Sequence, residues 1–393
     1  MKIGIFTDTY SPTVNGVVSS INILKNGLEN LGHKVYIITV KKDNSFNNNS
    51  DIIEIPGISL PIIPEHKIGM FYSYKLINKI KKLNLDIVHT QTEFSAGLLG
   101  RFIAKLYNIP VVHTYHTMYE NYVHYLTGGK MERIASNLAK KMSKLYCKNC
   151  DELIAPTEKT KNALKSYGLK KDINVIPTGI SLKKFKKKIN NNILNNLKYK
   201  LGIINDNPIL LYIGRLAKEK SIDIIIKNMP LVLKKVPDVK LLIIGDGPEK
   251  SNLKKLSQKL EISNTIIFAG EKPWSEIQNY YKIADIFVNA SITETQGLTY
   301  IEAMASSLPV VARYDKNLED VIDDKKNGFF FENINDFTQI INCLLSNDLK
   351  RKKIRERAEE KANVYSAENF AKNIEKLYLN ILKEKGYLMG ITG

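Results

Sequence analysis

Short apolar runs alternate with longer stretches of helical spacing along most of the chain. The apolar runs are rich in Ile, Val and Leu, which is typical of strands buried on both faces of a sheet. Amphipathic patterns such as Val17–Leu31 and Ala96–Tyr107 lie between them. This order predicts an α/β fold with parallel sheets. In the first half we expect strands at Lys2–Thr7, Lys34–Val40, Asp51–Ile55, Asp86–Thr90, Val111–Thr114, Asp151–Ala155 and Asn174–Ile176.

The alternation fails around residues 183–205, where a run of lysines is followed by a cluster of asparagines. We interpret this stretch as the connection between two domains. The pattern then restarts, and the last stretch, Asp336–Lys385, has helical spacing throughout. Strands of the second half are expected at Pro208–Ile213, Val239–Ile244, Thr265–Ala269, Ile286–Asn289 and Pro309–Ala312. The predicted parts are an N-terminal domain (1–190), a linker (191–205), a C-terminal domain (206–370) and a terminal helix (371–393) that can pack back on the N-terminal domain.

Composition narrows the class of protein. A chain of 393 residues, 44% hydrophobic and 25% charged, is long enough for two hydrophobic cores. It has no apolar run of 18 residues, and its start, Met1–Phe6, has the pattern of a strand and not of a signal peptide. Cys147 and Cys150 have CxxC spacing, but no second pair or histidine is positioned to complete a zinc site. We therefore expect a cytoplasmic protein, soluble or peripheral, with no metal site.

Positive charge is concentrated in the first half. Residues 1–200 contain 30 Lys and Arg against 14 Asp and Glu, whereas residues 201–393 contain 28 against 26. Such asymmetry favours a polyanionic partner for the first half, either nucleic acid or a bilayer with anionic lipid. A compositional bias toward Lys and Asn is the alternative explanation, but it does not account for the near balance of the second half.

Two glutamates, Glu294 and Glu302, flank the point where the apolar strand Ile286–Val288 leads through a loop into a helix. Glu302 is expected about one turn into that helix, where a carboxylate can bind hydroxyls but repels phosphate. N–H groups at the start of a helix have no intrahelical partner and point toward any bound anion. Here they belong to Gln296, Gly297, Leu298 and Thr299. The layout suits a ligand that is part diphosphate and part sugar.

Cationic residues follow another predicted strand. Arg215 comes directly after Gly214 at the end of the strand that stops at Ile213, and Lys218 and Lys220 come shortly after it. An Arg in this position can bind a diphosphate through two parallel N–H bonds, and a Lys can bind it as a point charge. Such a clamp would stabilise a departing nucleotide diphosphate. The alternative is a solvated basic loop.

Two glycine-containing turns give weaker signals. Asn15 and Gly16 lie between the first strand and the first helix, where glycine permits a positive φ and a close approach of the helix to a ligand. A plain strand-to-helix loop is equally compatible with them. Gly245–Pro248 follows a later strand and predicts a tight turn before a helix, with an architectural role. The GxGxxG dinucleotide fingerprint is absent from the turn at Gly16.

Two histidines lie near the end of the strand Val111–Thr114, at the edge of the sheet where ligands bind. We favour His116 as the functional one, able to donate to sugar hydroxyls or phosphate oxygens, because His113 lies within the strand and can be packed. A structural role for both is the alternative.

Two segments of the first half are amphipathic and rich in lysine. His66–Asn84 has the spacing of a helix with aromatic residues near its start, and Lys130–Lys148 has a similar pattern. Helices of this kind can lie in an anionic membrane interface. For the second segment we favour the alternative that its apolar stripe packs on the sheet. The residues expected to contact lipid are Lys67, Phe71, Tyr72, Tyr74, Lys75, Lys79, Lys81 and Lys82.

Together these motifs resemble the retaining, nucleotide-sugar-dependent glycosyltransferases of family 4. The resemblance covers nearly the whole chain, and the most specific part is the glutamate pair within Thr293–Ala305. The segment His113–Tyr125 and the sequence Gln-Gly-Leu-Thr-Tyr at residues 296–300 are also similar to the corresponding segments of bacterial 1,2-diacylglycerol 3-glucosyltransferases. The family implies a GT-B fold, in which two doubly wound Rossmann-like domains face a cleft and C-terminal helices follow.

The resemblance also implies roles for individual residues. Arg215 and Lys220 would hold the diphosphate, Glu302 the ribose and Glu294 the hydroxyls of the donor sugar. The backbone at Gly16 and at residues 296–299 would complete the donor pocket, and His116 would contact the transferred sugar. Two positions depart from the family pattern, because Ser221 and Ser307 stand where glycine is usual.

The reaction that the resemblance implies is transfer of a hexose, glucose from UDP-glucose, onto diacylglycerol at the cytoplasmic membrane face, with retention and without a metal or other cofactor. Its partners would be a nucleotide sugar, a lipid acceptor and an anionic membrane surface. A mannosyl- or galactosyltransferase acting on another lipid or a soluble sugar is an alternative. A nucleic-acid-binding protein is the alternative from another class, but it gives no reason for the glutamate pair.

Overall fold

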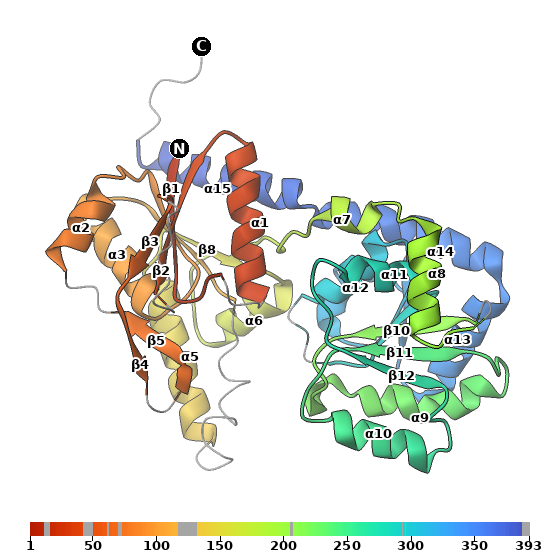
Figure 1. The fold of residues 1–393 in the computed structure, drawn as a ribbon. Coiled ribbons are helices and arrows are strands. Elements are labelled where there is room, and N and C mark those ends of the chain that lie inside the picture. Colours follow the sequence, from red (N-terminus) through yellow and green to blue (C-terminus); the bar gives the residue numbers. More distant parts are fainter. Residues whose placement is uncertain are drawn as a thin grey trace. The chain divides into compact units, whose positions relative to one another are not determined.

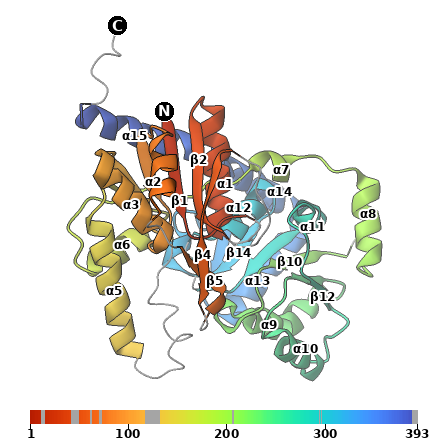
Figure 2. The same ribbon diagram turned by 60° about the vertical axis from the view of Figure 1, so that its left-hand side comes forward.

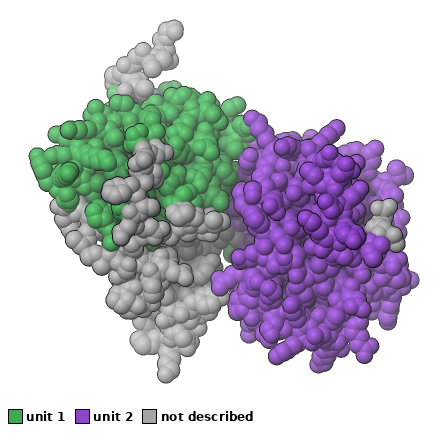
Figure 3. Space-filling model, in the orientation of Figure 1, with its two compact units in different colours: residues 1–179, 367–393 green, residues 180–366 purple. Residues whose placement is uncertain are grey.

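The computed structural model describes residues 1–11, 16–41, 50–60, 63–69, 73–116, 132–204, 207–292, 294 and 296–386 (Figure 1). For residues 58–60, 63–69 and 132–135 the description extends to the backbone alone. The chain forms two compact units (Figure 3). Unit 1 consists of residues 1–179 and 367–393, and unit 2 of residues 180–366. Each unit is described by itself.

Unit 1 is built on a seven-stranded sheet in the order β3-β2-β1-β6-β7-β8-β9, in which neighbouring strands pair in parallel. The chain order reverses between β1 and β6, and ligands of such sheets bind outside the carboxyl ends of the strands near this point. The strands are β1 (Lys2–Thr7), β2 (Lys34–Val40), β3 (Ile52–Ile55), β6 (Ile87–Thr90), β7 (Val111–Thr114), β8 (Glu152–Ala155) and β9 (Asn174–Val175).

Helices cover both faces of this sheet (Figures 1 and 2). Successive strand residues point to opposite faces, and both sets are apolar, so Ile5 packs with one helical layer and Phe6 with the other. The layer next to Phe6 contains α2 (Tyr74–Lys81), α3 (Ser95–Tyr107), α5 (Glu132–Lys148) and α6 (Glu158–Ser166). The layer next to Ile5 contains α1 (Gly16–Asn30) and α15 (Ala367–Glu384).

The segment predicted as one helix over His66–Asn84 has a different structure. A hairpin of β4 (Gly57–Leu60) and β5 (Ile63–Gly69) comes first, and α2 begins only at Tyr74. In the hairpin Gly57 pairs with Gly69 and Ile58 pairs with Ile68. Glycine is a poor helix residue and isoleucine is β-branched, so strand pairing is favoured over the helix that the lysine and aromatic spacing indicated.

Unit 2 has a six-stranded parallel sheet in the order β12-β11-β10-β13-β14-β15. Five strands lie where the apolar runs predicted them, and β15 was not predicted. The strands are β10 (Ile209–Ile213), β11 (Lys240–Ile244), β12 (Ile266–Gly270), β13 (Ile286–Asn289), β14 (Val310–Arg313) and β15 (Gly328–Phe331).

The helices of unit 2 also form two layers. One face of the sheet packs against α7 (Leu182–Lys186), α11 (Ile277–Ile283) and α12 (Leu298–Ala305). The other packs against α9 (Ile222–Leu233), α10 (Lys250–Lys259) and α13 (Ile334–Ser346). The helix α14 (Asp348–Ala362) contributes to both cores. Short 3-10 turns are η2 (Lys218–Lys220), η3 (Lys316–Leu318) and η4 (Asn363–Tyr365).

The boundary between the units differs from the predicted linker at 191–205. Unit 2 already begins at Ile180, and Phe185 of α7 is fully buried in its core. The helix α8 (Asn191–Lys200) occupies most of the predicted linker. Asn190 caps it, because its side-chain oxygen accepts a hydrogen bond of 2.8 Å from the N–H of Asn192. Asparagine is unfavourable inside a helix but favourable as an N-cap, so composition alone obscured this helix.

The terminal helix α15 returns to unit 1 and packs along α1. A Cβ atom at Gly27 of α1 would lie 2.6 Å from the Cβ of Ala371, so glycine permits this close approach. Within the described part of the chain, no helix has both the length and the apolar content needed to span a bilayer.

Candidate active site

The carboxyl edge of the sheet in unit 2 brings several predicted residues to one place. The strands β10 and β13 are neighbours and run in parallel, so the loop after Ile213, with Arg215, and the loop after Asn289, with Glu294, leave the same edge. The next loop packs tightly against the first. A Cβ at Gly245 would lie 1.9 Å from the carbonyl oxygen of Gly214, so only glycine fits there. This supports the predicted architectural role of the turn at Gly245–Pro248.

Lys220 and Glu294 form an ion pair at this edge. The Nζ of Lys220 donates to Oε1 of Glu294 at 2.6 Å, and the two side chains are only 23% and 14% exposed. Asn317 of η3, itself buried, donates from Nδ2 to the backbone oxygen of Glu294 and so fixes the loop. Arg215 has an exposed side chain, and its carbonyl oxygen accepts a hydrogen bond from the hydroxyl of Tyr212. A preformed cation and carboxylate therefore lie within one hydrogen bond of each other.

Glu302 lies on α12 with only 5% of its surface exposed. Burial raises the pKa of its carboxyl from 4.5 to about 7, although a hydrogen bond from Tyr281 and attraction to Lys184 oppose the shift. The Tyr281 hydroxyl donates to Oε2 of Glu302 at 2.7 Å, and burial also raises the pKa of Tyr281, so it remains a donor. This carboxyl is thus held in one orientation and changes its charge near neutral pH.

The helix α12 begins beyond Gly297, whose φ of +69° lies in the left-handed region that favours glycine. Glycine has no side chain that can accept from the N–H groups of the first turn, so their acceptors must come from elsewhere. Of the predicted donors, Gln296 is buried, and Leu298 and Thr299 are partly buried. The N–H groups at the start of this helix therefore stay a predicted anion site.

A second set of predicted residues belongs to unit 1. His116 lies two residues beyond β7, and its Nε2 donates to Oε1 of Gln91 at 2.6 Å. Gln91 in turn donates from Nε2 to Nε2 of His89 at 3.0 Å, and Nδ1 of His89 lies 2.6 Å from the hydroxyl of Tyr378 on α15. Burial lowers the pKa of His116 to about 4, and burial also lowers the pKa of His89. Both rings are therefore neutral at pH 7, and this chain of bonds sets the tautomer of His116.

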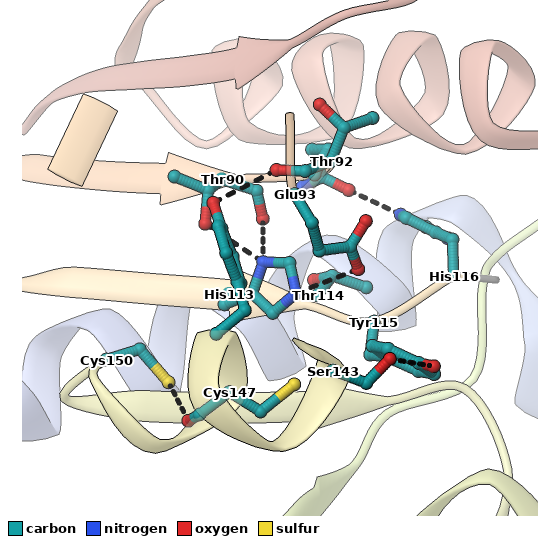
Figure 4. Close-up of polar contacts among 12 residues, drawn as sticks. Thr90, Thr92, Glu93, His113, Thr114, Tyr115, His116, Ser143, Cys147 and Cys150 are labelled. Carbon is teal, nitrogen blue, oxygen red and sulfur yellow. Dashed lines mark hydrogen bonds and ion pairs between the residues drawn. The ribbon is translucent and has the colours of Figure 1, made fainter. Parts of the chain in front are cut away.

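His113 lies inside β7 and is fully buried, in contrast to His116. Its Nδ1 is 3.0 Å from the backbone oxygen of Thr90, and its Nε2 is 3.3 Å from Oε1 of Glu93 (Figure 4). Cys147 and Cys150 are also buried nearby, and burial raises the pKa of both thiols. Among the described residues, no three His, Cys, Asp or Glu side chains are grouped so that they could hold a metal ion.

Gly16 begins α1, and a Cβ built on it would meet nothing within 4 Å. The packing of unit 1 therefore does not require glycine here, and the role of Gly16 in a donor pocket stays a prediction. Asn15 lies outside the described residues. Ser221 and Ser307, which stand where the family usually has glycine, both have a positive φ, of +50° and +62°. Glycine would be unstrained at these angles.

The candidate lipid contacts on α2 are exposed where the structure describes them. Tyr74 is 78% exposed, and Lys75, Lys79, Lys81 and Lys82 are exposed as well. Phe71, Tyr72 and the side chain of Lys67 lie outside the described residues. On α5, however, Leu138, Met142 and Leu145 are 58%, 60% and 66% exposed, so the expectation that this apolar stripe packs on the sheet is wrong.

Sequence reasoning missed the residues that hold the predicted ones in place. Gln91, Tyr281 and Asn317 each bond a candidate residue from a different element, and Lys184 attracts Glu302. Gln91, Tyr281 and Asn317 each lie 21 to 25 positions along the chain from the residue that they bond. The spacing rules of a single helix or strand do not relate residues so far apart. Their only signal was position, since Gln91 and Asn317 follow the ends of strands β6 and β14.

Comparison with known proteins agrees with this arrangement. The family model described as Glycosyl transferases group 1 matches residues 195–361, and the model described as Glycosyltransferase Family 4 matches residues 14–184. The alpha-monoglucosyldiacylglycerol synthase of Acholeplasma laidlawii is 39% identical, over 97% of this chain and 98% of its own length. That of Streptococcus pneumoniae is 40% identical, over 97% and 86%. The chain belongs to the family 4 glycosyltransferases, and it is a nucleotide-sugar-dependent hexosyltransferase.

Solved structures of glycosyltransferases have the same fold. Anabaena Alr3699/HepE in complex with UDP superposes with a TM-score of 0.73 at 16% identity, over 97% of this chain and 100% of that one. Sucrose-phosphate synthase from Thermosynechococcus elongatus gives 0.72 at 19% identity, over 98% and 99%. With the two parallel sheets, these matches confirm the predicted GT-B fold of two Rossmann-like domains.

Proposed function

We propose that this enzyme transfers glucose from UDP-glucose to diacylglycerol at the inner face of the cell membrane, with retention of configuration. The observation that supports this most is the ion pair of Lys220 and Glu294 at the carboxyl edge of the sheet in unit 2. A cation for a diphosphate beside a carboxylate for hydroxyls fits a nucleotide sugar better than a simple anion. Two relatives are named as synthases of monoglucosyldiacylglycerol, which supports glucose and diacylglycerol as the substrates.

In the proposed donor complex, Arg215 and Lys220 bind the diphosphate. Glu294 accepts hydrogen bonds from the glucose hydroxyls, and Glu302 accepts them from the ribose. The first turn of α12 directs N–H groups at the diphosphate, and Gly297 lets the phosphates approach because it has no side chain. Anabaena Alr3699/HepE, which has this fold, has been solved in complex with UDP and with UDP-glucose, which supports uridine as the nucleoside.

Retention follows in this proposal from attack on the same face of the sugar that the diphosphate leaves. The bond from the anomeric carbon to the phosphate oxygen breaks, the bond to the lipid oxygen forms, and the lipid hydroxyl proton passes to the departing phosphate. Arg215 and Lys220 stabilise the charge that develops on the leaving group. His116 is neutral at pH 7, so it can contact the sugar without repelling the positive charge that develops there. Because two cations already neutralise the diphosphate, we expect the reaction to need no metal ion.

The proposal is tested by incubating the enzyme with radiolabelled UDP-glucose and vesicles that contain diacylglycerol, followed by lipid extraction. Label should appear in the lipid fraction, and alkaline and glucosidase treatment should identify an α-linked glucose. Glu294→Gln should abolish the label, whereas Glu356→Gln, an exposed change on α14, should not. Preferential transfer from GDP-mannose or UDP-galactose, or transfer to a water-soluble acceptor alone, would contradict the assignment.

A further inference from the structure

The outer surface of unit 1 has an exposed row of large apolar side chains along α3. Phe94, just before the helix, and Leu98, Phe102 and Leu106 follow each other at four-residue spacing and are 47–54% exposed. The inward face of the same helix is separately filled by residues such as Leu99 and Ile103. Residues four apart lie on one side of a helix, so these four side chains form a stripe of which about half of the surface is exposed.

A second stripe lies on the neighbouring helix α5, formed by Leu138, Met142 and Leu145. Side chains of the two helices are in direct contact. The guanidinium of Arg101 on α3 lies 3.5 Å from the ring centroid of Tyr146 on α5, and it donates to the carbonyl oxygen of Asn149 at 3.0 Å. The two stripes therefore lie on helices that contact each other, and we call them together the α3–α5 face. It consists of Phe94, Leu98, Phe102, Leu106, Leu138, Met142 and Leu145.

The charges on this face are of one sign. Residues 94–109 and 136–149 contain no Asp or Glu. Lys105 on α3 and Lys141, Lys144 and Lys148 on α5 are exposed beside the apolar stripes. A protein partner with an apolar patch would not need such uniform charge. Apolar side chains flanked by lysines match instead a membrane interface, where the apolar groups enter the acyl boundary and the cations meet anionic headgroups.

The distribution of other exposed apolar residues supports the same conclusion. In unit 2, Ile193, Tyr199, Leu349 and Val364 are 53–83% exposed, but they lie on α8, α14 and η4 and form no row along one helix. Scattered residues of this kind are normal on protein surfaces, whereas a contiguous apolar patch usually marks an interaction site. The α3–α5 face combines rows of exposed apolar side chains along two helices with exposed lysines.

We propose that the α3–α5 face is the surface that docks this enzyme on a bilayer containing anionic lipid. This proposal rests on the proposed function, because it supposes a lipid acceptor, but it names a surface that differs from the α2 segment suggested by the sequence. The cations of α2 extend the same layer, since Nζ of Lys81 lies 5.6 Å from the ring centroid of Tyr107 on α3. They add electrostatic attraction, and the apolar insertion comes from α3 and α5.

The test compares two triple variants of the full-length enzyme. Leu138→Ser, Met142→Ser and Leu145→Ser together remove the α5 stripe, and Ile193→Ser, Leu349→Ser and Val364→Ser remove three similarly exposed residues of unit 2 as a matched control. Binding is measured by sedimentation with phosphatidylglycerol–phosphatidylcholine vesicles. Each buried apolar side chain of this size contributes about tenfold in affinity, so the α5 variant should bind at least about 100-fold more weakly. The control should bind like the wild type.

Activity on two acceptors separates this proposal from the proposed function. The α5 variant should lose turnover on long-chain diacylglycerol in vesicles but keep turnover on dihexanoylglycerol dispersed in solution. Unchanged vesicle binding by the α5 variant, or an equal loss in the control, would overturn the docking face while leaving the glucosyltransferase intact. A wild-type dimer that the α5 variant breaks would instead make this face a contact between two copies of the chain. Failure of the wild type on both acceptors would refute the proposed function, and vesicle sedimentation would still report on docking.

Discussion

We expect the carboxylate of Glu302 to contribute to donor binding but to lower the stability of the fold, and a single substitution can test both effects. Its carboxyl is buried on α12 and accepts one hydrogen bond from Tyr281. Glu302→Gln keeps the shape and an oxygen acceptor for Tyr281 but removes the charge. We therefore expect the variant to be a more stable protein and a poorer enzyme, with a gain in stability that begins near pH 4.5 and reaches its full size above about pH 7.

The magnitude follows from the pKa of Glu302, 4.5 without burial and about 7 in the folded protein. Below pH 4.5 the group is protonated in both states, so its charge costs nothing. Between pH 4.5 and about 7 the folded protein retains a proton that the unfolded chain has lost, so the free energy of unfolding falls as pH rises. The difference corresponds to about 3 kcal/mol above pH 7 and about 1 kcal/mol at pH 5. Glutamine does not have this cost.

The assay uses Trp274, the only tryptophan of the chain, as a fluorescent reporter of unit 2 during urea unfolding. Trp274 is 54% exposed, but its ring packs against the buried Phe185 of this unit, with the ring centroids 5.9 Å apart. The free energy of unfolding of Glu302→Gln should exceed that of the wild type by about 3 kcal/mol at pH 8 and by about 1 kcal/mol at pH 5. Glu294→Gln, which breaks an ion pair with Lys220, should give no gain at pH 8. A gain in Glu302→Gln that is equal at the two pH values would refute the reasoning.

Three further predictions concern other residues. Wild-type KM for the donor should fall as pH rises through about 7, because ionised Glu302 accepts from ribose hydroxyls more strongly, and this dependence should vanish in Glu302→Gln. Gln91→Leu should lower kcat by about tenfold or more with little change in vesicle binding, because the hydrogen bond that orients His116 is lost; kcat equal to wild type would exclude that role. Ser221→Gly should raise the free energy of unfolding by about 0.5–1 kcal/mol, since Ser221 has a φ of +50°. Ser307→Gly should raise the free energy of unfolding by a smaller amount, because this variant also loses a hydrogen bond to Glu359. Urea unfolding of both variants and the wild type at one pH checks the two predictions.

The strands of both sheets could be predicted because a parallel sheet buried on two faces requires unbroken apolar runs. The segment Lys34–Val40 and the strand at Ile286–Asn289 are clear cases. The stripe on α5 was misjudged because helical spacing shows that a face is apolar but not what covers it. The inward face of α5 is formed by residues such as Ser143 and Cys147, so its sheet-facing side is smaller and less apolar than its outer side. Only coordinates distinguish these two faces.

The candidate site could be predicted in part for a similar physical reason. Residues at the carboxyl ends of parallel strands share one edge of a sheet, so Arg215 and Glu294 were expected at the same edge. The contact between Lys220 and Glu294 spans 74 positions and depends on β10 and β13 being adjacent, which the chain order does not dictate. The buried partners such as Tyr281 were not predicted, because a tyrosine among apolar residues has the pattern of a core residue.

The C-terminal helix shows most clearly why unit 1 cannot be understood from the first half of the sequence. Tyr378 of α15 bonds His89, which is 289 positions earlier, and so completes the chain of bonds that ends at His116. The helix also buries Phe370, Ile374, Tyr378, Ile381 and Leu382 against the sheet and α1. At about 1.5–3 kcal/mol each, these five side chains contribute about as much as the whole free energy of unfolding of a typical domain. Unit 1 therefore depends on α15 both for its stability and for the position of His116, so residues 1–179 do not form a complete domain.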